Sequence, residues 1–389
     1  MSRILYLTSG ESHGQALTAI LDGMPSGVPV SIEAINHQLY RRQQGYGRGG
    51  RMTIEKDQVQ ILSGVRFGKS LGSPICLQVP NKDWVSWQDE MAVQGKAKNL
   101  RRVVTRPRPG HADLSGGMKY DHDDLRNVLE RASARETTMR VATGAVARQL
   151  LEACGIELIG FVVELADVNL GEKRLPFDEI ISVSEASPVR TLDKKIEKAM
   201  MARIDQAKKK GDSLGGVFEV LVRGLPVGLG NFVQWHRKLD GQLAQAIMSI
   251  QAIKGVEIGL GFEAARRFGS QVHDSLFYEA KKGFYRKTNG AGGLEGSMTN
   301  GELLVIRGAM KPISTLYTPL DSVDIKTKQA FKASIERSDT CALPAAAVIA
   351  ENAVAITLAD ALLEKTGGDS LKEVKRNLNA YKKQIENYG

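Results

Sequence analysis

The chain has 389 residues, of which 42% are hydrophobic and 25% charged; these proportions indicate a folded protein with a sizeable core and exclude global disorder. Lysine and arginine outnumber aspartate and glutamate by 53 to 44, a formal net charge of +9, which suits either nucleic acid or an acidic small molecule as the ligand. Three widely spaced cysteines argue against a disulfide framework and a metal site. The N-terminal apolar stretch is too short for a signal sequence, so we expect a cytoplasmic location.

The first candidate site follows a short strand-like segment at the N-terminus. The sequence GESHG at residues 10–14 places His13 in a loop bounded by glycines. Catalytic groups are commonly mounted on loops of a rigid scaffold, although a lone loop histidine is more often an ordinary surface residue. His13 is therefore a candidate proton donor, with a surface role as the alternative.

A glycine- and arginine-rich segment, RRQQGYGRGGRM, spans residues 41–52. Its GYGRGG stretch matches the letters of a dinucleotide fingerprint, but such a fingerprint follows a strand and opens a helix. Here the order is reversed, because Ile32, Ile35 and Leu39 predict a helix before the segment and alternation over residues 52–62 predicts a strand after it. We interpret the segment as an anion-binding loop. Its arginines are Arg41, Arg42, Arg48 and Arg51.

A second loop histidine lies in RPRPGHADLSGG, residues 106–117. Pro107 and Pro109 stiffen the chain before His111, and glycines that we expect in turns follow it. His111 is a candidate proton donor with the same surface alternative as His13. The other histidines lack such a setting and are expected to be structural: His37, His122, His236 and His273.

Residues 124–153 predict one long helix with an inward apolar stripe. Arg135 falls within that stripe, so a cation points toward the core, and Arg131 lies one turn earlier. Like charges at this spacing repel each other unless an anion neutralises them. Two interpretations stay open: an anionic ligand, or ion pairs with Glu130 or Glu136.

The second half of the chain predicts antiparallel strands over residues 215–230 and 303–310, where apolar residues alternate between glycines. An apolar helix follows at about residues 343–364, and its polar interruptions favour a buried core helix over a membrane span. The last 20 residues predict a polar, peripheral helix. The fold class is therefore α+β, with buried helices packed on sheets.

Three polar residues stand among turn formers before the apolar helix: Lys311, Arg337 and Asp339. Asp339 has a plain structural alternative as the N-terminal cap of that helix. The sequence carries no P-loop, no G-x-S-x-G and no H-E-x-x-H, so it gives no support to a P-loop nucleotide site, a serine hydrolase or a metalloprotease.

Taken in this order, six motifs together resemble the chorismate synthase family: GESHG, RRQQGYGRGGRM, RPRPGHADLSGGMKY, RASARETTMRVATGAVA, GLGFEAARRFGS and ERSDTCALPAA. The resemblance implies one domain over residues 1–389, a β-α-β sandwich with helices between antiparallel sheets, usually assembled as a homotetramer. It implies conversion of 5-enolpyruvylshikimate 3-phosphate to chorismate and phosphate by a 1,4-anti elimination, the last common step of the shikimate pathway to aromatic amino acids. The reaction is redox-neutral yet requires reduced FMN, which lends an electron to the substrate and recovers it.

The resemblance also assigns ligands. Arginines suit a substrate with two carboxylates and a phosphate because a guanidinium binds both groups through paired hydrogen bonds. The implied anion ligands are Arg42, Arg48, Arg108 and Arg135, and the first two also match positions associated with NADPH as a source of reducing equivalents. The implied FMN contacts are Arg131, Ala132, Ser133, Gln251, Ala252, Gly296, Lys311, Pro312, Ile313, Ser314, Thr315 and Arg337.

The catalytic roles implied by the resemblance fall on three residues. His13 is the acid that stabilises the departing phosphate, His111 the donor to reduced flavin, and Asp339 the acceptor of the proton from flavin N5. Ala132 stands where many relatives have a serine, so any role of that hydroxyl is absent and the contact rests on Ser133 and the backbone.

Two alternative functions are kept. A basic polyanion- or nucleic-acid-binding protein is motivated by the net charge, but the cations are spread over distant motifs and the arginine loop has a single aromatic residue, Tyr46. A flavin-dependent oxidoreductase with net electron transfer would consume NADPH in step with its product.

Overall fold

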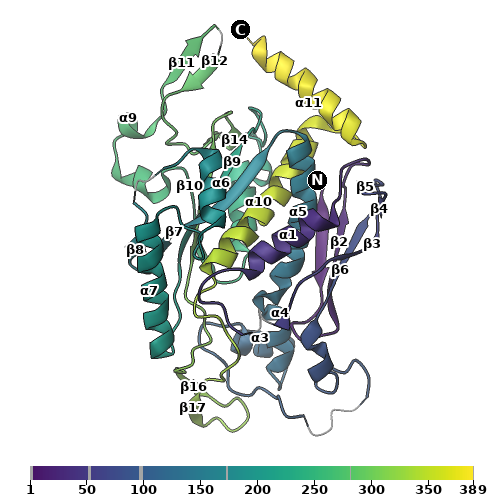
Figure 1. Cartoon of the computed structure of the whole chain (residues 1–389), viewed down its shortest axis with the longest axis vertical. Coiled ribbons are helices and arrows are strands. Elements are labelled where there is room, and N and C mark those ends of the chain that lie inside the picture. The colour runs from purple at the N-terminus through teal and green to yellow at the C-terminus, as the bar shows by residue number, and fades with distance from the viewer. Residues whose placement is uncertain (1–2, 51–53, 96–99, 172–173, 281, 389) are drawn as a thin grey trace.

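Two antiparallel sheets enclose a layer of helices in the computed structural model of the chain (Figure 1). The structure describes residues 3–50, 54–95, 100–171, 174–280 and 282–388. The first sheet has the strand order β1-β2-β6-β3, and the second has the order β10-β15-β9-β7-β8. The predicted α+β fold, with helices between antiparallel sheets, is confirmed.

The strands of the first sheet are β1 (Leu5–Ser9), β2 (Ala16–Asp22), β3 (Gln60–Ser63) and β6 (Ile75–Pro80). Those of the second are β7 (Glu157–Leu165), β8 (Val168–Asn169), β9 (Gly216–Arg223), β10 (Ile253–Ile258) and β15 (Leu304–Met310). Short pairs complete the strands: β4 (Val65–Arg66) with β5 (Lys69–Ser70), β11 (Leu276–Glu279) with β12 (Gly283–Arg286), β13 (Leu294–Glu295) with β14 (Met298–Thr299), and β16 (Asp321–Val323) with β17 (Ala330–Lys332).

The central helices are α1 (Ile32–Gln43), α5 (Thr137–Ala153) and α10 (Leu343–Thr366). The others are α3 (Asp113–Tyr120), α4 (Arg126–Ala132), α6 (Phe177–Glu185), α7 (Lys194–Lys210), α8 (Leu239–Met248), α9 (Gly269–Val272) and α11 (Leu371–Glu386). The short 3-10 helices are η1 (Lys82–Ser86), η2 (Ala134–Glu136), η3 (Trp235–Arg237) and η4 (Gly261–Arg266).

Helices α5 and α10 form the centre of the sandwich. α5 packs on β2 and β6, α10 packs on β7 and β9, and the two helices pack on each other. They approach closely because Gly144 of α5 has no side chain; a Cβ at this position would lie 2.5 Å from the Cβ of Asn352 on α10. This contact joins the two halves of the core.

Helix α10 is long and apolar enough to cross a membrane, but 89% of its most apolar stretch is buried inside the protein. Pro344 lies in its first turn, where a missing backbone N–H costs nothing. Its end is marked by Gly367 at φ 63°, a conformation that favours glycine. The predicted core helix is confirmed, and so is the polar C-terminal helix, which is α11 and buries Val374 and Leu378.

A buried ion cluster fastens α1 to the other two central helices. Glu351 of α10 is fully buried, accepts hydrogen bonds from Arg41 Nη1 at 2.9 Å and Nη2 at 3.0 Å, and is paired with Arg148 of α5. Glu185 bridges Arg41 and Arg190. Because Arg41 lies in the last turn of α1, this cluster fixes the end of the helix that also carries Arg42.

Three sequence expectations about local structure were wrong. The helix expected over residues 124–153 is interrupted at Ser133, whose ψ of 140° is extended and whose hydroxyl caps η2 by accepting from Arg135 N. Among the described residues of the strand expected over 52–62, the strand begins only at Gln60. Residues 51–53 lie outside the part of the chain that the structure describes. The two glycines after His111 lie in α3, where Gly116 faces Val128.

The Glu185 ion cluster yields a pH-dependent prediction. Burial opposes ionisation of Glu185, but Arg190 and Arg41 outweigh it and lower the pKa of the carboxyl to about 2. A depressed pKa in the folded state contributes stability above the ordinary glutamate pKa of about 4.3 and loses it as the pH falls toward 2. We expect Glu185→Gln to reduce the free energy of unfolding at pH 7 by about 1 kcal/mol, with the difference from the unmodified protein shrinking between pH 5 and pH 3. Urea unfolding at several pH values measures it; a constant difference would contradict the assignment.

Candidate active site

The loop between β1 and β2 holds His13 in a buried position. Its Nδ1 lies 2.8 Å from Glu130 Oε1, and its backbone N–H donates to Glu130 Oε2 at 2.7 Å. The indole of Trp87 stacks on the imidazole at a centroid distance of 3.8 Å. Nε2 lies 4.0 Å from Asp83. The surface alternative for His13 is therefore wrong.

Two of the predicted arginines share one buried carboxylate. Arg135 Nη1 donates to Asp57 Oδ1 at 2.7 Å, and Arg42 Nη1 lies 3.5 Å from Asp57 Oδ2. Burial lowers the pKa of Arg42 to about 9; attraction by Asp57 opposes the shift, while repulsion from Arg135 and Arg48 adds to it. Arginine stays charged at neutral pH, so the shift indicates a buried cation that an anionic ligand would stabilise further.

Asn81 connects this arginine pair to the loop of His13. Its Oδ1 accepts from Arg135 Nε at 3.0 Å and Nη2 at 2.9 Å, while its Nδ2 donates to the carbonyl of Gly14 at 2.8 Å. Arg42 is anchored next to it, donating from Nε to Thr137 Oγ1 at 3.0 Å. The GESHG loop, the end of α1 and η2 thus belong to one hydrogen-bonded network.

Asp339 lies against the arginine-rich loop. Its Oδ2 is 3.2 Å from Arg48 Nε, and its Oδ1 accepts from the backbone N–H of Gly49 at 2.6 Å. A Cβ at Gly49 would meet the carbonyl of Ser338 at 2.6 Å, so only glycine permits this approach. The N-cap position of α10 is Ala342, and the cap alternative for Asp339 is therefore wrong.

A second group surrounds His111, which lies in the loop before α3. Its Nδ1 is 2.6 Å from Asp113 Oδ1, and Arg108 donates to the same carboxylate from Nε at 2.8 Å. Although burial opposes it, these hydrogen bonds hold the pKa of Asp113 well below its usual range. Arg108 Nη1 donates to Thr315 at 2.8 Å, and Lys311 Nζ donates to the Gly110 carbonyl at 2.5 Å. The residues predicted at 108, 111, 311 and 315 are thus brought together.

Several residues expected to contact FMN are joined by hydrogen bonds or ion pairs to the segments around His13. Ser133 Oγ donates to Ser12 Oγ at 3.1 Å, and Arg131 donates to the Thr8 carbonyl at 2.8 Å. Ala132 precedes Ser133 at the end of α4. Arg337 is paired with Asp83. These contacts place the expected residues of α4 around the loop that carries His13.

The expected contacts at residues 251–252 and 311–315 also meet. Lys311 N donates to the Ala252 carbonyl at 2.9 Å, and the carbonyl of Ile313 accepts from Ser213 Oγ at 2.6 Å. Gln251 Nε2 donates to Glu136 at 3.2 Å, while its Oε1 is buried without a hydrogen-bond partner among the described residues. Pro312 and Ser314 lie in the same irregular segment after β15.

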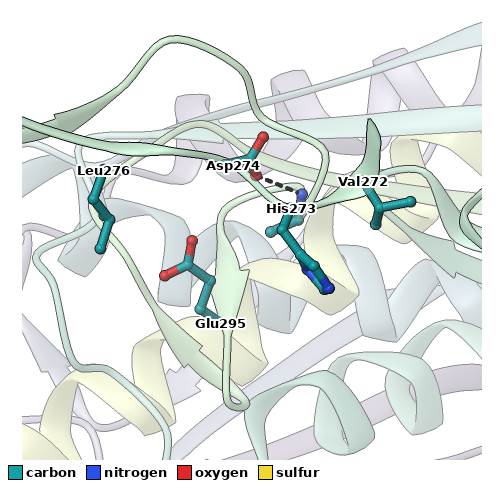
Figure 2. A pocket seen from close by; sticks show the side chains of 6 residues that line it. Val272, His273, Asp274, Leu276 and Glu295 are labelled. Atoms are coloured by element: carbon teal, nitrogen blue, oxygen red, sulfur yellow. Dashed lines mark hydrogen bonds between the residues drawn. The ribbon is translucent and has the colours of Figure 1, made fainter. Parts of the chain in front are cut away.

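Gly296 stands apart from the other expected contacts. It lies in the turn between β13 and β14, and the nearest atom to a Cβ there is the Phe232 Cβ, 4.0 Å away. A cavity of about 240 Å³ adjoins the turn through Glu295 (Figure 2). Asp274, which lines this cavity, accepts hydrogen bonds from the backbone N–H groups of Gly290 and Ala291 and so holds the loop that contains them. None of the expected site residues lines this cavity.

A larger cavity of about 590 Å³ opens beside His13. Its lining includes Asp83 and Trp87, which both contact His13, and Arg337. Arg102 and Arg126 bring further positive charge, each within cation–π distance of the Trp87 ring. The cavity is therefore polar, rich in arginine and lined by two residues that contact the histidine.

Four residues that hold the site together were not recognised in the sequence: Asp57, Asn81, Trp87 and Asp113. Glu130 was expected only as an alternative ion-pair partner of the α4 and η2 arginines, and that was wrong, since Arg135 pairs with Asp57 and Glu55 while Arg131 donates to backbone carbonyls. Asp113 stood in the quoted motif, two residues after His111. The described residues contain no cluster of three or more potential metal ligands.

Comparison with known proteins gives a consistent result. The family model for chorismate synthase matches residues 4–363. A chorismate synthase from Geobacter sulfurreducens is 58% identical over 383 residues, covering 97% of this chain and 98% of that protein. One from Brevibacillus brevis is 58% identical over 385 residues, covering 98% of this chain and 100% of that protein.

The fold gives the same match. A crystal structure of a chorismate synthase superimposes with a TM-score of 0.80 at 45% sequence identity, covering 99% of both chains. Sequence and structure therefore agree over nearly the whole length of the chain. The chain belongs to the chorismate synthase family.

Proposed function

We propose that the chain converts 5-enolpyruvylshikimate 3-phosphate to chorismate and phosphate by a 1,4-anti elimination that depends on reduced FMN. The observation that carries this proposal is that the His13 loop and the buried Arg42–Asp57–Arg135 group form one network through Asn81. A substrate with two carboxylates and a phosphate needs fixed cations beside a proton donor, and this network supplies both. The comparisons give the polyanion-binding alternative no support.

Four arginines are the proposed ligands of the substrate's anionic groups: Arg42, Arg48, Arg108 and Arg135. Arg42 has the strongest support, because its ion pair with Asp57 is long and Asp57 is shared with Arg135. A bound carboxylate or phosphate would supply the close negative charge that the buried Arg42 guanidinium lacks. Arg42 and Arg48 are also the proposed contacts of NADPH as a source of reducing equivalents.

Reduced FMN is the proposed cofactor. Its proposed contacts are Arg131, Ala132, Ser133, Gln251, Ala252, Gly296, Lys311, Pro312, Ile313, Ser314, Thr315 and Arg337. The residues fit this group, because Arg131, Lys311 and Arg337 carry positive charge and the buried Gln251 Oε1 is an acceptor that a ring N–H would satisfy. When bound, reduced FMN would lend an electron to the substrate as phosphate departs and recover it as the hydrogen leaves.

Three side chains are the proposed carriers of protons. His13 is the acid that stabilises the departing phosphate, and its buried, stacked position excludes water from one face of the ring. His111 is the second donor. Asp339 is the acceptor, and the Gly49 N–H and the Arg48 guanidinium hold its carboxylate in place.

The assembly that we propose is a homotetramer of one-domain chains in the cytoplasm. Support comes from the outer face of the first sheet, where apolar side chains are exposed to solvent. Leu7 is 78% exposed and lies opposite Ile20, which is 50% exposed; Leu5 and Leu62 extend the same apolar area. An apolar surface of this kind is typical of contacts between subunits.

The proposed reaction has a direct test. With chemically reduced FMN under anaerobic conditions, we expect the protein to release phosphate from 5-enolpyruvylshikimate 3-phosphate together with the absorbance of chorismate. With oxidised FMN and no reductant, we expect neither product. Equal activity in both conditions would contradict the dependence on reduced flavin, and no activity in either, from folded protein, would contradict the proposed function.

Replacement of either histidine tests the proton donors. We expect His13→Ala and His111→Ala each to lower kcat by roughly 10²- to 10⁴-fold, the usual contribution of a positioned general acid. His37→Ala is the control, since His37 lies on α1 outside the site contacts described above. Steady-state kinetics measures the effect, and near-full turnover in either variant would remove that histidine from the mechanism.

The apolar sheet face predicts its own effect on assembly. We expect light scattering to give the unmodified protein four times the chain mass, and Leu7→Arg to shift it toward smaller species because a buried unpaired cation is costly. Val93→Arg, at a position that is 96% exposed and outside the sheet, is the control. A monomeric unmodified protein would contradict the tetramer, whereas a tetramer unaffected by Leu7→Arg would contradict this face as the contact.

A further inference from the structure

The two candidate proton donors share an arrangement that the proposed mechanism does not use. In each, the imidazole Nδ1 lies within 3 Å of a buried carboxylate: 2.8 Å for His13 and Glu130, and 2.6 Å for His111 and Asp113. In each, an arginine contacts the same carboxylate oxygen as the histidine does. The side chains of Glu130 and Asp113 are 1% and 0% exposed.

The arginine partners fix the carboxylates independently of the histidines. Arg126 lies one turn before Glu130 on α4, with Nη1 at 3.4 Å from Oε1. Arg108 binds Asp113 through two nitrogens, Nε at 2.8 Å and Nη2 at 3.0 Å. The chain therefore builds an arginine–carboxylate–histidine series twice, from unrelated segments of sequence.

We propose that Glu130 and Asp113 are positioning residues that keep the proton of each histidine on Nδ1, so that Nε2 is the atom from which His13 and His111 transfer protons. An ionised carboxylate only accepts hydrogen bonds, so the nitrogen beside it must be the donor. A neutral imidazole with Nδ1–H has its lone pair on Nε2, and the protonated ring carries its transferable proton there. The same logic applies to both sites.

Other charged groups also lie near each ring, farther from its nitrogens than the carboxylate beside Nδ1. Near His13, Asp83 lies 4.0 Å from Nε2 and is itself paired with Arg337. Near His111, Arg108 Nη2 is 3.0 Å from Nδ1 and 3.4 Å from Nε2. That guanidinium and the Nδ1–H of His111 both donate to Asp113 Oδ1, which accounts for their proximity.

Both carboxyls are favoured in the ionised form. Burial opposes ionisation of Glu130, but the hydrogen bonds from His13 and the charge of Arg126 outweigh it and lower the pKa of the carboxyl. The corresponding pKa of Asp113 is lowered for the same kind of reason, by His111 and Arg108. A carboxyl that stays ionised cannot act as the donor in its hydrogen bond to the imidazole.

For His13, two further contacts restrict the ring. The Trp87 indole stacks on one face at an interplanar angle of 20°, and the His13 backbone N–H donates to the second oxygen of Glu130. Glu130 thus holds both the ring and the loop that carries it. The stack fixes the plane of the ring, and a flip within that plane would break the Nδ1 bond to Glu130, so the two contacts together fix the orientation of Nε2 before any substrate binds.

The first test needs no substrate or flavin. Long-range proton–nitrogen correlation spectra of the full-length protein, labelled with ¹⁵N at histidine, distinguish the two neutral tautomers. Signals are assigned by their loss in His13→Ala and His111→Ala. At alkaline pH we expect both rings as the Nδ1–H form, whereas most exposed histidines prefer Nε2–H. The Nε2–H form for either ring would overturn the inference for that site.

The second test rests on the proposed function and uses Glu130→Gln and Asp113→Asn, which keep shape and remove charge. We expect kcat to fall about 10²-fold or more in both variants, and the alkaline limb of the kcat profile to move to lower pH. KM should change little in Glu130→Gln, whereas Asp113→Asn also loosens Arg108, a proposed substrate ligand, and should raise KM. Glu219→Gln, which removes a buried carboxylate paired with Arg307 and Arg174 but with no histidine, is the matched control.

The outcomes separate the two claims. Unchanged kcat and an unchanged pH profile in both amide variants would overturn the positioning role. If Glu130→Gln does not fold, the tautomer spectra of the unmodified protein still decide the inference. An inactive unmodified protein with both rings as Nδ1–H would contradict the proposed function and leave the positioning role intact.

Discussion

The buried carboxylate of Asp57 is the constraint on which the site depends. It lies between Arg135 and Arg42, two guanidinium groups that would repel each other without it. Each of the three groups comes from a different segment, namely the end of α1, the turn η2 and the irregular stretch before β3. Removing one member of such a buried set typically costs about 3–5 kcal/mol. The chain therefore keeps these segments together through charge, and the two guanidinium groups with one carboxylate keep a net positive charge in a buried position.

The packing of the helices between the two sheets holds the charged residues of the site in place. Glu351 in the core helix α10 anchors Arg41, and that contact fixes the last turn of α1 on which Arg42 lies. The interruption at Ser133 lets α4 and α5 approach the first sheet separately, so that Glu130 meets His13 while Arg135 meets Asp57. A continuous helix would hold these side chains on fixed lines of one cylinder. The break therefore allows both contacts to form.

Periodicity in the sequence predicted the fold class and the central helices, because burial of an apolar stripe follows directly from residue spacing. Neighbouring glycines and prolines, rather than periodicity, identified His13, His111 and the arginine-rich loop as candidates. The partners of these residues were not predictable, since Asp57, Asn81 and Trp87 meet them only through tertiary contacts. The break at Ser133 was missed because the apolar stripe continues across it. The cap alternative for Asp339 failed because the N-cap of α10 is Ala342, three residues after Asp339.

The central claim is that the site performs a redox-neutral elimination. It is tested most directly by counting chorismate formed against reduced FMN consumed, under anaerobic conditions with a limiting amount of reduced flavin and no other reductant. The account predicts many chorismate and phosphate molecules per flavin, with the flavin still reduced when the substrate is exhausted. One product per flavin, with oxidised FMN accumulating in step, would contradict it and indicate an oxidoreductase with net electron transfer.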